Sequence, residues 1–247
     1  MDIVITEAEG LRLLQFGTGW CQGVMRLDAP DRLELEYAVR MSAWLLFHEP
    51  ASLPGKHLLT LGLGAGSLTR FAHRVLRMQA TAVDIDAGVI AACRAHFMLP
   101  ADGDGLHLVH ADAVDFMARL RPPGSIDVLQ VDAYDASVDR PALDTAAFYA
   151  DCRTGLREGG TVAVNLIGRD LDVRQCVARI RNGLQPRTVW QFPPTAAGNV
   201  VVIAHCGELP PDDVLAARAT GIAQRWDLPA PAWLAMVRRS SAPTRNP

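Results

Sequence analysis

Carboxylates stand at the ends of three successive predicted strands in the middle of this sequence. Asp84 is the first aspartate of the segment QATAVDID, Asp112 follows LHLVHA, and Asp132 and Asp135 belong to VDAYDA after IDVLQ. The carboxyl ends of strands in a doubly wound sheet share one edge, and ligands bind there. The four side chains together would form a negatively charged wall, which suits a cationic ligand and repels a pyrophosphate. The alternative is that Asp132 and Asp135 only cap the turn after their strand.

A glycine-rich loop, LGLGAGS, precedes these carboxylates. Its glycines Gly62, Gly64 and Gly66 come directly after an apolar strand and before a helix. Glycine allows the backbone to approach a ligand without a Cβ clash, although such a loop also forms plain tight turns. Asp84 follows the loop at the sequence spacing of a carboxylate that binds a ribose. Dinucleotide and sulfonium-nucleoside sites share this feature. The later carboxylates favour a sulfonium nucleoside, with Asp112 placed to accept from an adenine amino group.

The segments around these motifs alternate between apolar runs and helical patterns, which predicts a doubly wound, mostly parallel, seven-stranded Rossmann-like sheet. Short strand patterns with Gly turn signals before residue 30 predict a small antiparallel β unit. We expect three parts, namely the β unit (1–30), the nucleoside-binding catalytic domain (31–206), and C-terminal helices with a polar tail (207–247). The predicted strands of the sheet cover 57–63, 79–86, 106–112, 126–134, 160–167, 188–193 and 199–205. The predicted helices cover 33–49, 67–77, 87–97, 113–120, 145–156, 172–184, 211–226 and 230–239.

The composition narrows the classes of partner. The net charge of −3 gives no electrostatic case for binding nucleic acid. The longest apolar runs are too short to cross a bilayer, and the N-terminus has no signal-peptide pattern. The five cysteines are scattered without a CxxC pair, which predicts reduced thiols and no structural metal. We therefore expect a soluble, cytoplasmic protein that binds neither nucleic acid nor membrane.

The sequence resembles the spermidine synthase (polyamine aminopropyltransferase) family, which is built on the class I S-adenosylmethionine methyltransferase fold. The resemblance covers roughly residues 10–205 and rests on GLGAG, VDID, HADA, DAYD and LREGGTVAVNL, with CQG and Glu36-Tyr37 upstream. It implies that the glycines of the loop line the nucleoside pocket. It further implies that Asp84 holds the ribose and that Asp112 holds the adenine of decarboxylated or intact S-adenosylmethionine.

The resemblance also implies roles for residues around the amine. Asp132 would position the attacking amine and help to remove its proton, and Asp135 would bind the amine substrate. Gln22 and Tyr37 resemble polar gate residues, Gln22 on the donor side and Tyr37 on the substrate side. A primary ammonium ion is no nucleophile until it loses a proton, so a carboxylate or the Tyr134 hydroxyl must accept one. The family's oligomers imply a homodimer.

Two positions depart from the family pattern. The family's loop usually reads Gly-Gly-Gly-Asp-Gly, whereas this chain has Ala65 in place of the aspartate. That carboxylate would attract the amine of the decarboxylated donor and repel the carboxylate of intact S-adenosylmethionine, so Ala65 weakens the selection. The family's Tyr-His-Glu is Tyr37-Ala-Val-Arg40 here. Arg40 would argue against a diamine if it pointed into the pocket, and would have no such effect at the rim of the core.

The leading hypothesis is therefore transfer of an aminopropyl group from decarboxylated S-adenosylmethionine to a small-molecule amine. The first alternative is an S-adenosylmethionine-dependent methyltransferase, which Ala65 favours. The second is a non-catalytic homologue that keeps the nucleoside pocket. An NAD-dependent dehydrogenase is the least favoured, because carboxylates at all these strand ends do not suit a pyrophosphate.

Overall fold

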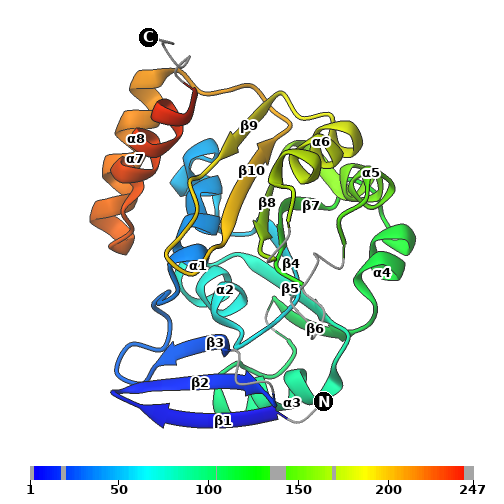
Figure 1. The fold of residues 1–247 in the computed structure, drawn as a ribbon, viewed down its shortest axis with the longest axis vertical. Coiled ribbons are helices and arrows are strands. Elements are labelled where there is room, and N and C mark those ends of the chain that lie inside the picture. Colours follow the sequence, from blue (N-terminus) through cyan, green and yellow to red (C-terminus); the bar gives the residue numbers. More distant parts are fainter. Residues whose placement is uncertain (1–2, 18–20, 104, 134–142, 169–170, 242–247) are drawn as a thin grey trace.

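A computed structural model describes residues 3–17, 21–103, 105–133, 143–168 and 171–241, with side chains up to residue 237 (Figure 1). Its strands are β1 Ile3–Ala8, β2 Leu11–Phe16, β3 Cys21–Arg26, β4 His57–Leu61, β5 Gln79–Asp84, β6 Leu106–His110, β7 Ile126–Val131, β8 Leu156–Leu166, β9 Thr188–Gln191 and β10 Val200–His205. Its α-helices are α1 Glu36–Met41, α2 Ser67–Arg70, α3 Ala87–His96, α4 Ala113–Arg119, α5 Ala146–Gly155, α6 Val173–Leu184, α7 Asp212–Trp226 and α8 Ala230–Ser241.

Seven of these strands form one sheet in the order β6-β5-β4-β7-β8-β10-β9, and β1, β2 and β3 form a separate antiparallel sheet. Strands β4 to β8 run parallel, and β10 is antiparallel to both β8 and β9. The predicted fold class is confirmed. The strand order reverses between β4 and β7, so a crevice is expected beyond their carboxyl ends. The boundaries expected at residues 30 and 206 stay a prediction.

Helices cover both faces of the large sheet. Successive side chains along a strand point to opposite faces, so they belong alternately to two hydrophobic clusters. Leu58 belongs to one cluster with residues of α1, α2, α3, α7 and α8, while its neighbour Leu59 belongs to a second with residues of α4, α5 and α6. Because successive strand side chains point to opposite faces, a strand covered on both sides is mostly apolar instead of alternating. None of the described helices is both long and apolar enough to cross a membrane.

Three predicted elements differ from the observed ones. The helix expected over 33–49 is a short α-helix, α1, followed by a 3₁₀ helix at Ser42–Phe47, all of whose residues are buried. The helix expected over 67–77 begins at the left-handed Gly66 and passes into a π-helical turn at Phe71–Val75. The residues Arg157 to Gly160, expected to close a helix, belong to β8. In each case tertiary packing overrides the local pattern.

The small sheet packs directly on the glycine loop. A Cβ added at Gly23 would lie 2.5 Å from the Cβ of Ala65, so only glycine allows β3 this approach. The Ser67 hydroxyl donates to the carbonyl of Val24 at 2.9 Å. These contacts fix the neighbouring Gln22 over the carboxyl ends of the large sheet.

Two buried histidines lie in the core between the 3₁₀ helix and the strands β8 and β10. His48 Nε2 is 3.0 Å from Thr161 Oγ1, which is 2.8 Å from His205 Nδ1. Burial, followed by the proximity of His205, lowers the pKa of His48 to about 3, and burial lowers the pKa of His205 to about 4. Both rings are therefore neutral in the folded protein near pH 5.

We expect the free energy of unfolding to fall as the pH is lowered from 7 to 5. The unfolded chain binds protons at these two histidines below about pH 6.5 whereas the folded chain does not, so each costs about 2 kcal/mol over this interval. Urea unfolding at both pH values measures the loss. Replacing His205 by Gln should remove about half of this histidine-dependent difference, and replacing the exposed His107 by Gln should leave it intact. Equal pH dependence in His205→Gln and the wild type would contradict the assignment.

Candidate functional site

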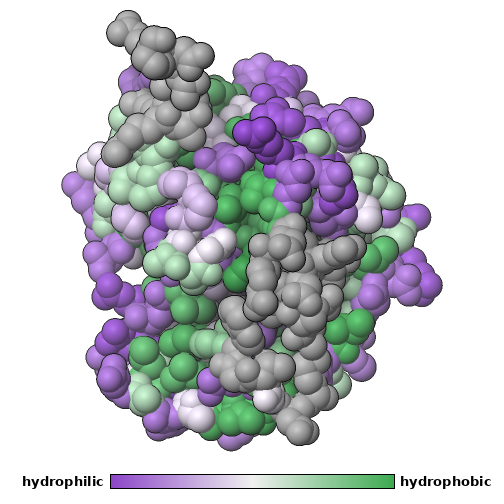
Figure 2. All heavy atoms as spheres, viewed as in Figure 1, coloured by the Kyte–Doolittle hydropathy of each residue, from purple (hydrophilic) through white to green (hydrophobic). Residues whose placement is uncertain are grey.

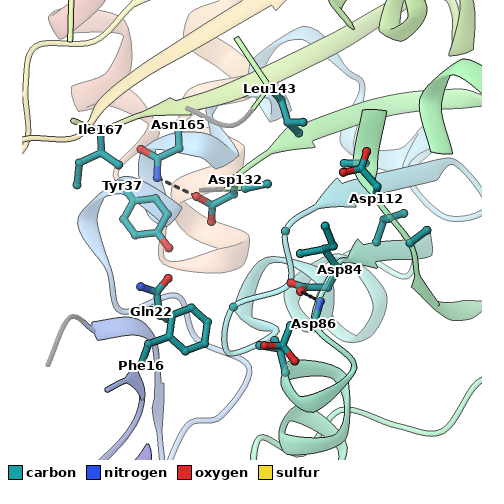
Figure 3. Close-up of a pocket in the computed structure, with 18 of the residues that line it drawn as sticks. Phe16, Gln22, Tyr37, Asp84, Asp86, Asp112, Asp132, Leu143, Asn165 and Ile167 are labelled. Atoms are coloured by element: carbon teal, nitrogen blue, oxygen red, sulfur yellow. Dashed lines mark hydrogen bonds between the residues drawn. The ribbon is translucent and has the colours of Figure 1, made fainter. Parts of the chain in front are cut away.

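A cavity of about 280 Å³ lies beyond the carboxyl ends of the parallel strands, at the point where the strand order reverses. Figure 3 shows its wall, to which the small sheet, α1 and the ends of the large sheet's strands all contribute side chains. Apolar side chains, among them Phe16, Val83 and Leu143, line part of the cavity, as is usual for a small-molecule site. In Figure 2, hydrophobic side chains gather in the middle and lower part of the face shown.

The glycine loop forms one side of the cavity. Gly62 has φ of +89°, and a Cβ there would meet the carbonyl oxygen of Asp132 at 2.4 Å. Gly64 has φ of +50°, and a Cβ there would meet the carbonyl oxygen of Gln22 at 2.8 Å. Both glycines line the cavity. Gly66 lies at the N-cap of α2 with φ of +69°, close to Leu99 and away from the cavity wall.

Asp84 lies at the end of β5 and supports the loop. One of its carboxylate oxygens accepts from the backbone N–H of Leu63 at 2.8 Å, and the other accepts from that of Asp86 at 2.9 Å. Burial raises the pKa of Asp84, against these two hydrogen bonds. Each carboxylate oxygen has a second lone pair, so the group can also accept from a ligand. Asp86 caps α3 by accepting from the N–H of Gly88.

Asp112 lies on the same side of the cavity, after the neighbouring strand β6, at the N-cap of α4. Its Oδ1 accepts from the backbone N–H groups of Val114 and Asp115, at 2.8 and 3.1 Å. The capping contacts anchor one oxygen, and the residue still lines the cavity. Between Asp84 and Asp112 the exposed side chain of Ile85 also lines the cavity, which provides an apolar surface for a flat ring.

Asp132 follows β7 and lines the cavity. Asn165 Nδ2 donates to its Oδ1 at 2.8 Å (Figure 3), and the Tyr37 hydroxyl also hydrogen-bonds to it. Burial raises the pKa of Asp132 to about 7, although both hydrogen bonds act to lower it. The same burial, together with the Asp132 charge, raises the pKa of Tyr37 well above its ordinary value. A carboxyl group that titrates near neutral pH can both accept and release a proton there.

The N-terminal segment closes the cavity from the other side. Gln22 and Cys21 of β3, Phe16 of β2 and Tyr37 of α1 all line it. The structure thus brings together Gln22 and Tyr37 with the strand-end carboxylates, as the sequence predicted for these positions, while their roles stay predictions. Tyr134 and Asp135 lie outside the described residues.

Arg40 does not reach the cavity. Its side chain is buried, and its guanidinium donates to the Glu36 carboxylate and to the carbonyl oxygen of Pro193. It therefore adds no positive charge to the described wall, and the residues that line the cavity include four carboxylates, Asp84, Asp86, Asp112 and Asp132. A wall of this charge suits a cationic ligand.

Sequence reasoning missed several lining residues. Asn165 is a polar residue near the carboxyl end of an otherwise apolar strand, and that position was a usable signal. Asn199, directly before β10, also lines the cavity. Phe16, Leu143 and Ile167 have no local signal, because only tertiary packing brings them to the wall. Among the described residues, no three or more His, Cys, Asp or Glu side chains are grouped so that they could hold a metal ion.

Comparisons with known proteins relate the chain to others by sequence and by fold. No family model matches it. It is 35% identical over 204 residues to a polyamine aminopropyltransferase of Chromobacterium violaceum, covering 82% of this chain and 76% of the relative. Its structure is similar to that of a probable spermidine synthase from Corynebacterium glutamicum, with a TM-score of 0.75 and 20% identity over 90% of this chain and 82% of the other.

A second solved structure shares the fold. Human methyltransferase-like protein 13, in complex with SAH, matches with a TM-score of 0.65 and 23% identity, over 80% of this chain and 93% of that one. At these identities the structural matches show the fold alone.

We expect Gly62→Ala to impair the cavity, because a Cβ there would meet backbone 2.4 Å away and the residue has φ of +89°. The variant should lose about 1–3 kcal/mol of stability or shift the loop against β7. Thermal unfolding and calorimetric titration with a sulfonium nucleoside measure the two effects. Gly55→Ala is the matched control, since Gly55 has φ of +83° with nothing within 4 Å of the added Cβ. Equal losses of nucleoside binding in both variants would show that the close approach to Asp132 is unimportant.

Proposed function

This chain belongs to the polyamine aminopropyltransferase family, and we propose that it transfers an aminopropyl group from decarboxylated S-adenosylmethionine to an amine. The sequence match to the Chromobacterium violaceum enzyme confirms the resemblance expected from the motifs. The observation that carries the proposal is Asp132, a desolvated carboxyl group with a pKa of about 7 on the wall of an acidic cavity. Such a group can take a proton from an amine at neutral pH.

The cavity wall has the parts that the donor requires. Gly62 and Gly64 line the cavity, and the absence of a Cβ lets the loop pass directly against the backbone of Asp132 and Gln22. We assign the ribose hydroxyls to the free lone pairs of Asp84 and the adenine amino group to Asp112. Gln22 lies over the loop, where it can contact the donor's chain. The sulfonium charge and the donor's amine are both favoured by the acidic wall.

The reaction is a displacement at the carbon next to the sulfonium sulfur. The substrate ammonium first loses a proton to Asp132, directly or through the Tyr134 hydroxyl. The lone pair of the amine nitrogen then forms the new N–C bond while the C–S bond breaks. The electron pair of the C–S bond goes to sulfur, so that methylthioadenosine leaves. Asp132 and Tyr37 hold the nitrogen in line with that carbon, and Asp135 binds the acceptor. Correct alignment supplies much of the remaining acceleration.

We expect kcat/KM to rise with pH through about 7, because Asp132 accepts a proton only when it is ionised. The bound cationic donor stabilises the ionised carboxylate of Asp132. The rise of kcat with pH should therefore occur at lower pH than the rise of kcat/KM. Asp132→Asn should lower kcat by roughly 10²–10⁴-fold and retain donor binding. Asp115→Asn, on the exposed side of α4, is the control. Unchanged turnover in Asp132→Asn would exclude Asp132 as the base.

Ala65 supports methyl transfer as a second candidate function. Its side chain is 2% exposed and borders a smaller cavity that Gln22, Tyr37 and Asp132 also line. No carboxylate stands at position 65 to repel the carboxylate of intact S-adenosylmethionine. The fold shared with a methyltransferase is compatible with this reaction.

A product assay by mass spectrometry separates the candidates. The protein is offered decarboxylated or intact S-adenosylmethionine, each with and without di- and polyamines. We expect methylthioadenosine from the decarboxylated donor only when an amine is present. S-adenosylhomocysteine from the intact donor would instead establish methyl transfer. Donor binding without either product would identify a non-catalytic homologue.

The finer expectations remain proposals. We propose a polyamine acceptor, a homodimer, and action in the cytoplasm without nucleic-acid or membrane partners. Light scattering of the purified chain tests the dimer directly, and a monomer would contradict it.

A further inference from the structure

A chain of hydrogen bonds leads to Asp132 from the turn between β9 and β10. The Thr195 hydroxyl donates to Asn199 Oδ1 at 3.3 Å, Asn199 Nδ2 donates to Asn165 Oδ1 at 3.0 Å, and Asn165 Nδ2 donates to Asp132 Oδ1 at 2.8 Å. The residues Thr195, Asn199 and Asn165 are buried, at 6%, 4% and 3% exposure. Asn199 and Asn165 line the cavity, whereas Thr195 lies behind its wall.

The far end of this chain is anchored on the backbone. The backbone N–H of Asn199 donates to Thr195 Oγ1 at 3.0 Å. The Thr195 hydroxyl has one proton, which it donates to Asn199 Oδ1. With its oxygen accepting from Thr195, Asn199 presents its NH₂ group to Asn165. Asn165 accepts that bond through its carbonyl oxygen, so its own NH₂ group faces Asp132.

We infer that Asn199 is a positioning residue for Asp132, because it fixes the orientation of the Asn165 amide so that a donor and not an acceptor faces the carboxylate. A reversed Asn165 would place its carbonyl oxygen against Asp132 and disfavour the ionised form. Figure 3 shows the Asn165 amide directed at Asp132. The inference deepens the proposed function, in which Asp132 is the base, but the effect on Asp132 itself does not require turnover.

The turn that carries Asn199 is anchored to the helix that carries Tyr37. The N–H of Ala196 donates to Glu36 Oε2 at 3.3 Å, and Arg40 donates to both Glu36 and the carbonyl of Pro193. The Thr195 N–H donates to the carbonyl of Asn199 at 2.8 Å, which closes the turn. The two donors to Asp132, Asn165 and Tyr37, are thus held by one connected set of contacts.

Other groups act on Asp132 from the elements around it. Tyr37 faces it from α1 and Cys21 lies beside Tyr37 on β3, while Asp84 lines the same cavity from the end of β5. Tyr134 and Asp135 follow Asp132 in the sequence after Ala133. These groups are identical in all the variants below, so differences between variants report on the amide chain.

The test is a carboxyl ¹³C NMR titration of the full chain without ligand, with the Asp132 signal assigned by its loss in Asp132→Asn. In the wild type the midpoint should lie near pH 7. Asn199→Ala should raise it by about half a unit to one unit, the effect of weakening one hydrogen bond to a charged group. Thr195→Val should raise it less, and Thr195→Ser, which keeps the hydroxyl, should leave it unchanged.

A folded Asn199→Ala protein, judged by circular dichroism, with the wild-type midpoint would overturn the inference. If Asn199→Ala does not fold, the pair Thr195→Val and Thr195→Ser decides, and equal midpoints in that pair would overturn it. In active protein, the pH at which kcat/KM rises should shift between variants in the same direction as the NMR midpoint. A wild type that forms no product from either donor would refute the proposed function, while the carboxyl titration would still decide the role of Asn199.

Discussion

The cost of removing the Asp132 carboxylate from water is the constraint on which the site depends. A desolvated carboxylate is stable only if donors reach it, and here one donor comes from β8 and one from α1. Burial nevertheless outweighs both, since the pKa is raised. Fewer donors would leave the group protonated at neutral pH, and more would make it a weak base. The balance between burial and hydrogen bonding therefore sets what Asp132 can do.

That balance requires segments far apart in the sequence to meet at one place. The reversal of strand order between β4 and β7 opens the crevice, and the left-handed Gly62 lets the loop pass against the backbone of Asp132. The small sheet then closes the crevice through the equally tight contact of Gly23 with Ala65. Both contacts are steric, so they define the width of the cavity more strictly than hydrogen bonds could. Three of the four carboxylates on its wall, Asp84, Asp86 and Asp112, also cap helices or hold the loop, which fixes them before any ligand binds.

The sequence predicted the parts of this arrangement that are local. Buried parallel strands are mostly apolar, turn glycines precede helices, and carboxylates follow strands, so the sheet, the loop and the positions of Asp84, Asp112 and Asp132 could be derived. The helix at 33–49 was wrong in detail because the burial of Ser42–Phe47 imposes a 3₁₀ turn on a helical pattern. Asn199 could be placed at a turn but not beside Asn165, because that contact depends on the antiparallel pairing of β10 with β8. Phe16 reaches the cavity only through the docking of the small sheet, which no periodicity encodes.

Arg40 shows how a departure from a motif can be absorbed by the fold. A cation three residues after Tyr37 would oppose a cationic substrate if it faced the cavity. Its partner Glu36 lies one helical turn earlier, at a spacing that favours an ion pair. The carbonyl of Pro193 satisfies the guanidinium further, so the charge is used to hold the β9–β10 turn against α1. The acidic character of the described wall is preserved, and the same contact stabilises the turn from which Asn199 reaches Asn165.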